Sequence, residues 1–284
     1  MHEFIARSLD CNWRFLAQEC PTFEDAMELF RKPSFVGGVV TMPYKTTIMA
    51  HFDDLDDHCV KIGACNNVYR ATDGSLRGMN TDWRGIKSCL TFASDESKGR
   101  PALIIDVGGA CRAAVHALYE ELRCTPIYAV NRDEGKVRDL LEDTKPYGSG
   151  LQIIHLRSVE EATSLTGMPY YIVGTVSDFE PQTSAEIEAR DILVTILSSS
   201  REKGVLLDMC FKPRITRTLK VGEQHGWTMV EGTGIIAIRS TSSIGYGVVK
   251  RIVRGFPDRK PGECCKRLCR RVRQSIFDYV GVGV

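Results

Sequence analysis

The sequence lacks an apolar run long enough to cross a bilayer. Its first residues also lack the charged segment followed by an apolar segment that is typical of a signal peptide. We therefore expect a cytosolic protein with no membrane partner. It also lacks an excess of one charge, because the formal net charge of its 284 residues is +1. A charge this small excludes the strong overall field that draws many proteins to nucleic acid.

No Cys-x-x-Cys pair occurs, although the chain has 11 cysteines. The odd number, and the apolar surroundings of residues such as Cys89 and Cys124, predict buried free thiols. Cys264, Cys265 and Cys269 lie close together, but no histidine or acidic ligand repeats at a suitable spacing. We therefore predict no metal site.

Two patterns of secondary structure divide the chain. Up to about residue 90, short predicted strands and helices surround clusters of polar residues. From Ala102 onward, apolar runs alternate with helical patterns, which predicts a parallel sheet covered by helices on both faces. We therefore predict an α/β protein with an N-terminal α/β domain over 1–90, a Rossmann-like doubly wound domain over 91–238 and a basic tail over 239–284. No feature predicts the oligomeric state.

The elements of the first domain follow from periodicity and turn residues. Helices are predicted between Phe4 and Trp13, over 23–30 with Thr22 as N-cap, over 43–51 and over 53–60, and strands over 34–41, 66–70 and 76–79. In the second domain, strands are predicted over 102–106, 127–130, 151–155, 170–173 and 205–209, and helices over 110–122 and 134–141.

Three short polar clusters lie between residues 41 and 82, each at the end of a predicted strand or the start of a helix. They contain a lysine, a carboxylate, two carboxamides and a hydroxyl, namely Lys45, Asp82, Asn66, Asn80 and Thr41. Taken one at a time, these residues also suit a solvated surface with turns. Their clustering at strand ends, where ligand sites of α/β proteins form, favours a binding site.

Lys45 and Asp82 together suit the transfer of a proton. A lysine acts as a general base when its surroundings favour the neutral amine, and a nearby carboxylate orients it and shares the proton. Asn66 and Asn80 each donate and accept hydrogen bonds, which suits neighbouring hydroxyls on a ring, and Thr41 adds one more hydroxyl. The pattern indicates oxidation of a ring alcohol without a metal.

A glycine-containing turn follows the first strand of the second domain and precedes a helix. Gly108, Gly109 and Ala110 would let the backbone approach a pyrophosphate at the N-terminus of that helix. This context indicates a dinucleotide as the cofactor.

The end of the next predicted strand, at Asn131, Arg132 and Asp133, is where such folds recognise the adenosine ribose. An arginine there favours a 2′-phosphate, and an acid favours a 2′-hydroxyl. The cofactor is therefore predicted to be NAD or NADP, and Asp133 favours NAD.

The motifs Val-Thr-Met-Pro-Tyr-Lys over 40–45, Gly-Ala-Cys-Asn-Asn over 63–67 and Asn-Thr-Asp-Trp over 80–83 resemble the substrate domain of the shikimate/quinate dehydrogenase family. The resemblance covers roughly residues 1–238. It is strongest to the quinate dehydrogenases of filamentous fungi, and it extends to the shikimate dehydrogenase domain of the fungal multifunctional shikimate-pathway protein. Segments 99–104, 130–133 and 181–183 resemble the quinate enzymes.

The resemblance implies an NAD(P)-dependent oxidoreductase that interconverts quinate or shikimate, a small ring acid, with the 3-dehydro acid. It implies that Lys45 and Asp82 are the catalytic pair, and that Thr41 and Asn66 bind the ring. The chain departs from the family's pattern at its start, where the family's first strand and serine-rich loop are not found before the first predicted helix.

Other departures concern the cofactor turn and two later positions, Phe211 and Arg239. Asp106 and Val107 stand where the family has glycine or another small residue; a carboxylate repels phosphate, and valine takes a positive φ only at a cost. Alternatively, Asp106 caps the following helix. Phe211 replaces a tyrosine, and Arg239 replaces a glutamine that contacts the substrate. Arg239 would instead pair with the ring carboxylate.

The sequence leaves two functions open. One is the dehydrogenase, and the other is a catalytically impaired, dehydrogenase-like module that binds ligands or regulates the quinate pathway. The tail adds a second ambiguity, because residues 250–284 hold ten Lys or Arg against three Asp or Glu. Such a segment suits either a solvated end or a weak contact with nucleic acid or an anionic surface.

Overall fold

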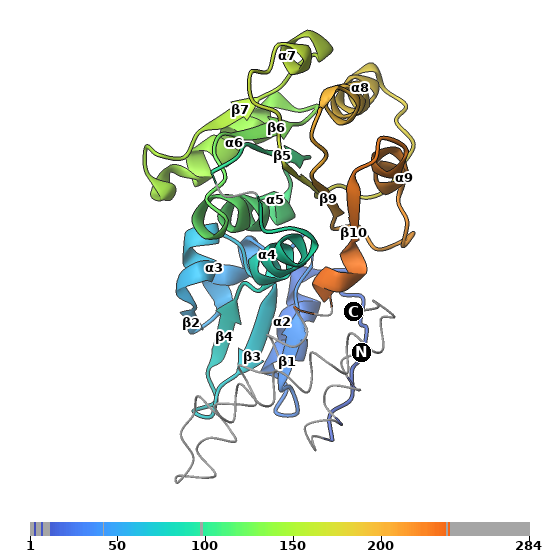
Figure 1. The fold of residues 1–284 in the computed structure, drawn as a ribbon. Coiled ribbons are helices and arrows are strands. Elements are labelled where there is room, and N and C mark those ends of the chain that lie inside the picture. The colour runs from blue at the N-terminus through green and yellow to red at the C-terminus, as the bar shows by residue number, and fades with distance from the viewer. Residues whose placement is uncertain are drawn as a thin grey trace. The chain divides into compact units, whose positions relative to one another are not determined.

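The structure is a computed structural model, and it describes residues 3, 7, 12–41, 43–96, 99–236 and 238. Most of the first predicted helix, Arg239 and the basic tail lie outside the described residues. The described residues up to 60, together with 64–81, belong to a first compact unit, and residues 61–63 and 82–235 form a second (Figure 1). The sequence had placed this boundary near residue 90.

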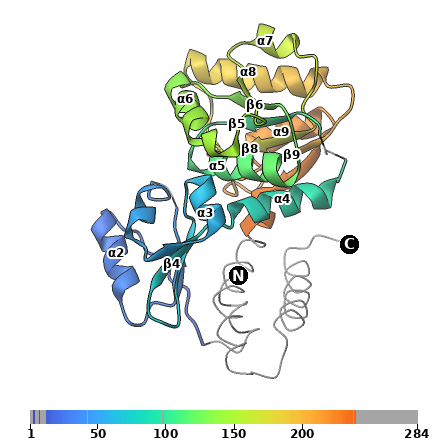
Figure 2. The same cartoon turned by 90° about the vertical axis from the view of Figure 1, so that its left-hand side faces the viewer.

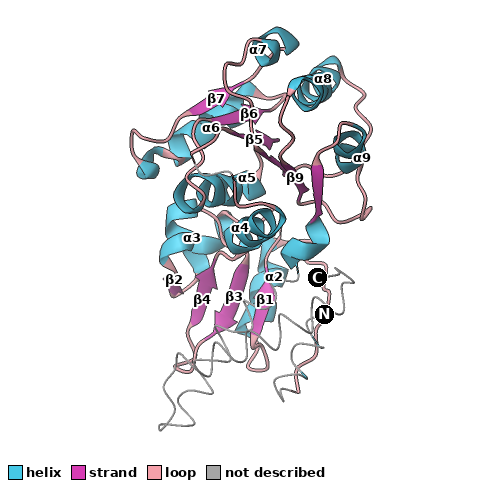
Figure 3. Cartoon of the chain, viewed as in Figure 1, coloured by secondary structure: helices cyan, strands magenta, loops and turns pink. Residues whose placement is uncertain are grey.

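The first unit contains a four-stranded sheet with the order β1-β3-β4-β2 (Figure 3). The strands are β1 (Gly37–Val39), β2 (Asp54–Leu55), β3 (Asn67–Arg70) and β4 (Leu76–Met79). β3 is antiparallel to both β1 and β4, whereas β2 is parallel to β4. The helices are α2 (Phe23–Arg31), the 3-10 helix η1 (Thr47–His51) and α3 (Asp57–Ile62).

Helix α2 begins where the sequence predicts, because the side chains of Thr22 and Asp25 each accept a hydrogen bond from the other residue's backbone N–H. The Asp25 N–H donates to Thr22 Oγ1 at 3.2 Å, and the Thr22 N–H donates to Asp25 Oδ2 at 2.9 Å. This capping box satisfies backbone donors that the first helical turn leaves unpaired. The helix buries Ala26, Met27 and Phe30. The core of the first unit consists of Met27, Phe30, Val40, Ile48, Cys59, Cys65, Val68 and Leu76.

Two helices predicted in the first unit are wrong in part. Residues 43–46 form a turn, and only a short 3-10 helix follows at Thr47–His51, because the β-branched run of Thr46, Thr47 and Ile48 suits an α-helix poorly. The segment over 53–60 is a strand followed by a helix. Asp56 Oδ1 accepts the Cys59 N–H at 2.6 Å, which favours a helix that begins at Asp57.

The second unit is built on a six-stranded sheet with the order β10-β9-β8-β5-β6-β7, in which all neighbouring strands are parallel. Its strands are β5 (Ala102–Ile105), β6 (Ile127–Val130), β7 (Ile153–His155), β8 (Tyr171–Gly174), β9 (Val205–Asp208) and β10 (Thr228–Glu231). Strands β5 to β9 confirm the five strands that the sequence predicts for this domain. β10 was not predicted, because a four-residue edge strand that is only partly buried carries a weak apolar signal.

The sheet is doubly wound. From β5 the chain proceeds to β6 and β7 on one side, and it then returns to β8, β9 and β10 on the other. The switch point therefore lies between β5 and β8, where ligands of such sheets bind. This topology, together with the separate N-terminal α/β unit, confirms the predicted fold class.

Helices cover both faces of this sheet. They are α4 (Asp82–Ala93), α5 (Gly109–His116) with a π-helical turn (Ala117–Glu121), α6 (Glu134–Asp143), the 3-10 turn η3 (Lys145–Tyr147), α7 (Val159–Thr163), α8 (Ser184–Ser199) and α9 (Arg217–Gln224). Figures 1 and 2 show α4 and α5 on one side of the strands and α8 on the other. The core beneath α8 and α9 includes Leu103, Tyr128, Ile172, Ile192, Ile196, Leu206 and Leu219.

Helix α4 packs closely within the second unit because it carries a glycine at the contact. A Cβ on Gly85 would lie 2.6 Å from Ile235 Cγ2 and 3.2 Å from the Ile235 carbonyl oxygen. No larger side chain fits there without moving the backbone. α4 also contacts α5, β9 and β10 of the same unit, whereas the sequence had assigned residues 82–90 to the first domain.

The described cysteines are free thiols, and five are buried: Cys59, Cys65, Cys89, Cys111 and Cys124. This confirms the prediction for those five, whereas Cys210 is only partly buried. Burial raises the pKa of Cys89 to about 12, so this thiol stays protonated near neutral pH. Among the described residues, no group of His, Cys, Asp or Glu side chains is placed to hold a metal ion. None of the helices in these residues is long and apolar enough to cross a membrane.

A buried carboxyl organises the connection from β9 to α9. Asp208 is 2% exposed; its Oδ2 accepts the Thr216 hydroxyl at 2.6 Å, and its Oδ1 accepts the Cys210 N–H at 3.0 Å. Thr216 also caps α9. Burial raises the pKa of Asp208 from 3.8 to about 6, the two hydrogen bonds lower it, and the charge of Asp178 raises it further.

We predict that Asp208 makes the protein less stable as the pH rises from about 4 to 6. Its pKa is higher in the folded state than in the unfolded state, so the stabilisation is complete below pH 3.8 and is lost as the pH rises through about 6. In denaturant unfolding, the free energy of unfolding of the Asp208→Asn variant should rise relative to that of the wild type across this window. The relative increase should reach on the order of 2 kcal/mol. The exposed Asp139→Asn variant is the control. Parallel pH profiles for the wild type and the Asp208→Asn variant would contradict this account.

Candidate active site

Lys45 lies in the turn that precedes η1, and its side chain is buried, with 8% of the residue exposed. The Lys45 carbonyl accepts the Cys65 N–H at 2.7 Å, which places the turn beside the segment that leads into β3. The turn begins at Thr41, whose backbone carbonyl accepts the Tyr44 N–H at 3.1 Å. Thr41 is exposed. The first two polar clusters are therefore adjacent in the first unit.

The third cluster joins them through a network of buried side chains. Asn66 Oδ1 accepts the Thr81 N–H at 2.8 Å and the Asn67 Nδ2–H at 2.7 Å. Asn67 Nδ2 also donates to Thr81 Oγ1 at 2.7 Å. The three residues are at most 2% exposed. Because Asn67 of β3 lies opposite Met79 of β4, the pairing of these strands brings the two asparagines to Thr81.

This network determines how Asn66 is oriented. A backbone N–H can only donate, so the amide oxygen of Asn66 must face Thr81, and its nitrogen must face away from that N–H. Within the described residues, the Asn66 nitrogen has only a long contact, 3.4 Å to Thr81 Oγ1. The nitrogen is therefore the part of this buried amide that keeps the capacity to donate a hydrogen bond. The cost of leaving its buried oxygen unsatisfied, about 1–3 kcal/mol, maintains this orientation.

Asn67 and Thr81 were not predicted as site residues. Their signal was present, because each adjoins a predicted residue inside a polar motif. Buried polar side chains need partners, so a second asparagine and a threonine beside a candidate ligand residue are expected to orient it. Sequence alone did not show that both would bond to the same carboxamide.

Asn80 and Asp82 flank Thr81 and differ in their surroundings. Asn80 is 1% exposed, and its Nδ2 donates to the Ala64 carbonyl at 2.8 Å, so this amide joins the end of β4 to the loop before β3. Asp82 is also 1% exposed and is the first residue of α4, where the helix dipole favours a carboxylate. Lys45 belongs to the first unit and Asp82 to the second.

The glycine-containing turn adopts its shape through Asp106. Asp106 has φ 69°, in the left-handed region, and Val107 does not have a positive φ. The expected strain at Val107 is therefore wrong, and the strained residue is an aspartate, which tolerates this region better than most residues. The alternative that Asp106 caps the helix is also wrong, because Gly108 is the N-cap of α5 and no side chain bonds there.

The Asp106 carboxylate lies over the turn instead. Its Oδ1 accepts the Asn131 Nδ2–H at 3.0 Å, and its Oδ2 is 3.4 Å from the place that a Cβ on Gly108 would take. Gly108, Gly109 and Ala110 lie at the N-terminus of α5, as the sequence predicts for a phosphate-binding turn. The Asp106 carboxylate places a negative charge beside this turn.

The three residues predicted after β6 are together at its carboxyl end, and each bonds to the protein. Asn131 Oδ1 accepts the Asp133 N–H at 2.7 Å. Asp133 caps α6 through the Gly135 and Lys136 N–H groups, so one of its carboxylate oxygens already has partners. Arg132 forms an ion pair with Glu186.

Two further predictions concern Phe211 and Arg239. Phe211 is 43% exposed, and as a phenylalanine it lacks the hydroxyl of the tyrosine that the family has at this position. Arg239 lies outside the described residues, and its pairing with a carboxylate stays a prediction.

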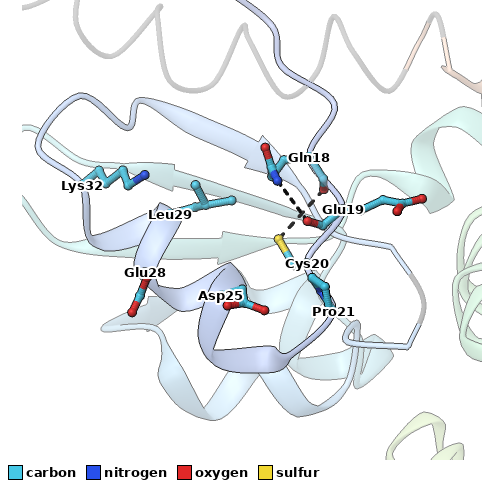
Figure 4. A pocket seen from close by; sticks show the side chains of 8 residues that line it. All are labelled: Gln18, Glu19, Cys20, Pro21, Asp25, Glu28, Leu29 and Lys32. Carbon is cyan, nitrogen blue, oxygen red and sulfur yellow. Dashed lines mark hydrogen bonds between the residues drawn. The ribbon is translucent and has the colours of Figure 1, made fainter.

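A shallow pocket of about 320 Å³ lies elsewhere on the first unit. It is lined by Gln18, Glu19, Cys20, Pro21, Asp25, Glu28, Leu29 and Lys32 (Figure 4). None of the predicted site residues lines it. Its hydrogen bonds in Figure 4 join Gln18, Glu19 and Cys20 to one another, so they hold the local chain together.

Comparison with known proteins gives one family and one fold. The family model for the shikimate dehydrogenase substrate binding domain matches residues 1–68. Quinate dehydrogenase of Emericella nidulans is 31% identical over 258 residues, which cover 82% of this chain and 78% of that protein.

Solved structures share the fold of this chain. The dehydroquinate dehydratase and shikimate dehydrogenase of S. pombe AroM is 25% identical with a TM-score of 0.68. The match covers 86% of this chain, which spans about half of that protein, 46%. Shikimate 5-dehydrogenase of Listeria monocytogenes, in complex with shikimate and NAD, is 23% identical with a TM-score of 0.69, over 87% of this chain and 85% of that one. Structures with this fold include complexes with NAD and with NADP.

We predict that Asp106 weakens dinucleotide binding. The Asp106→Gly variant should bind NAD about tenfold more tightly in calorimetric titration, because it loses a negative charge beside the pyrophosphate and relieves the left-handed backbone. Asp106→Asn removes the charge alone, so it should give part of the gain. Arg123→Gly is a matched control, because Arg123 also has a positive φ, of 59°. Equal affinities for the wild type and both Asp106 variants would show that the carboxylate does not oppose the cofactor.

Proposed function

Because the chain belongs to the shikimate/quinate dehydrogenase family, we propose that it interconverts quinate or shikimate with the corresponding 3-dehydro acid. The proposed cofactor is a nicotinamide dinucleotide, and the proposed partner is the small ring acid. The network of Asn66, Asn67 and Thr81 supports this proposal most strongly. It presents one amide donor, at a fixed orientation, in the segment that carries the family's motifs.

Proton transfer is assigned to Lys45 and Asp82. Oxidation of a secondary alcohol breaks one O–H and one C–H bond, so the site must accept a proton and a hydride. Lys45 Nζ takes the hydroxyl proton, and Asp82 orients the amine and stabilises the ammonium that forms. A bound oxidised nicotinamide supplies the hydride acceptor.

The remaining residues bind and orient the ring. Asn66 donates from Nδ2 to an oxygen of the ring, because its own oxygen is committed to Thr81 and Asn67. Thr41 adds a hydroxyl, and Asn80 maintains the segment that bears Asp82. Gly108, Gly109 and Ala110 would hold the pyrophosphate at the N-terminus of α5.

A second candidate function is a ligand-binding or regulatory module that keeps the ring site but does not turn over. The Asp106 carboxylate favours this candidate, since it opposes the cofactor while leaving the first unit unchanged. The two candidates differ in one measurable property, which is whether a dinucleotide binds.

The proposed function predicts both binding and turnover. The purified chain should bind NAD or NADP in calorimetric titration, and it should form the reduced cofactor, observed at its absorbance band, when quinate or shikimate is added. Ring-acid binding without any dinucleotide binding, in the wild type and in Asp106→Gly, would refute the dehydrogenase and favour the binding module.

Lys45 and Asp82 should affect the rate more than the binding of the ring acid. Lys45→Met and Asp82→Asn should each lower kcat by about 10²–10⁴-fold, which is the usual contribution of general acid–base catalysis. Ring-acid affinity, measured separately by calorimetry, should change by less than about tenfold. Lys61→Met, a change at a lysine paired with Glu120, is the control. A variant of Lys45 that retains most of kcat would disprove its role as the base.

A further inference from the structure

Arg132 is the residue after β6 that would contact a 2′-phosphate, but Glu186 holds it. Arg132 Nη1 forms an ion pair with Glu186 Oε1 at the start of α8. Its guanidinium also lies 5.9 Å from the centre of the Phe179 ring. We propose that Glu186 makes this chain select NAD over NADP, an inference that rests on the proposed function and names its cofactor.

Glu186 is itself held in place, so it cannot easily move away from Arg132. Its Oε2 accepts the Gln182 and Thr183 N–H groups, each at 3.0 Å, and the Thr183 hydroxyl accepts the Glu186 N–H at 3.3 Å. This is a capping box, in which the carboxylate is part of the helix terminus. The Glu186 side chain is 12% exposed, whereas Arg132 is 49% exposed.

The ion pair affects the two cofactors differently. A 2′-phosphate carries close to two negative charges, so it needs the positive charge of Arg132 and is repelled by a fixed carboxylate next to it. Glu186 neutralises the positive charge of Arg132, and it is itself the fixed carboxylate that repels the phosphate. The 2′-hydroxyl of NAD is uncharged and meets neither penalty.

Two acidic residues next to Arg132 in the sequence add negative charge. Asp133 adds a further negative charge, and its carboxylate is held at the start of α6 by the Gly135 and Lys136 N–H groups. Glu134 is also acidic, and its Oε1 lies 3.3 Å from Arg157 Nε in an exposed ion pair. Arg132 is the cation among residues 131–133, and its partner Glu186 decides whether a phosphate can use it.

The test compares NAD and NADP affinities by calorimetry in four proteins. Glu186→Gln retains the capping box, because glutamine also accepts the backbone N–H groups, but it removes the charge beside Arg132. It should bind NADP about tenfold more tightly than the wild type does, with NAD affinity changed by less than about twofold. The combined variant Arg132→Ala/Glu186→Gln should lose the gain, because the gain acts through Arg132.

Glu161→Gln is the matched control. Glu161 is also the third residue of a helix, α7, and its Oε2 accepts a backbone N–H, that of Arg157, at 2.7 Å. It should leave both affinities unchanged. Equal melting temperatures of Glu186→Gln and the wild type would show that the cap is intact.

The outcomes separate this inference from the proposed function. If NAD binds and the ratio of NADP to NAD affinity is the same in the wild type and in Glu186→Gln, the inference is overturned and the dehydrogenase remains. A wild type that prefers NADP would also overturn it. The comparison is repeated in the Asp106→Gly background, where binding should be tighter. If neither dinucleotide binds there, the inference and the dehydrogenase both fail.

Discussion

The pairing of β3 with β4 is the interaction on which the candidate site depends. It places Asn67 opposite Met79, and thereby brings two asparagines to the backbone and hydroxyl of Thr81. Because these groups are buried, each must find a partner inside the protein. The need to satisfy one amide oxygen orients Asn66, and the same strand end leads into α4 at Asp82. Backbone pairing, side-chain orientation and the start of a helix are therefore consequences of one strand register.

In the second unit, polar groups also find hydrogen-bond partners within the protein. Its glycine-containing turn keeps its shape although an aspartate occupies the left-handed position, since Asn131 bonds to the carboxylate. At the end of β6, Asp133 caps a helix and Arg132 pairs with Glu186. Polar groups that a dinucleotide would use are thus partly satisfied by the protein. In the first unit such satisfaction orients a side-chain amide, whereas here it occupies groups that a dinucleotide would need.

Local patterns explain which predictions succeeded. Thr22 predicts the start of α2 because a helix cap involves only neighbouring residues. The apolar runs of β5, β6 and β9 predict buried parallel strands because both faces are covered. The helix predicted over 53–60 failed for a non-local reason, because Asp54–Leu55 pairs with β4 as a strand.

By itself, the sequence determined the fold class, the family and the residues that could carry the chemistry, because periodicity and short motifs depend on residue type and spacing. The tertiary structure decided how those residues are used. It alone showed that Asn67 and Thr81 orient Asn66, that Asp106 takes the left-handed backbone, and that Glu186 holds Arg132 across 54 residues of sequence. These are pairings between distant segments, and a chain specifies them only when burial forces its polar groups to find one another.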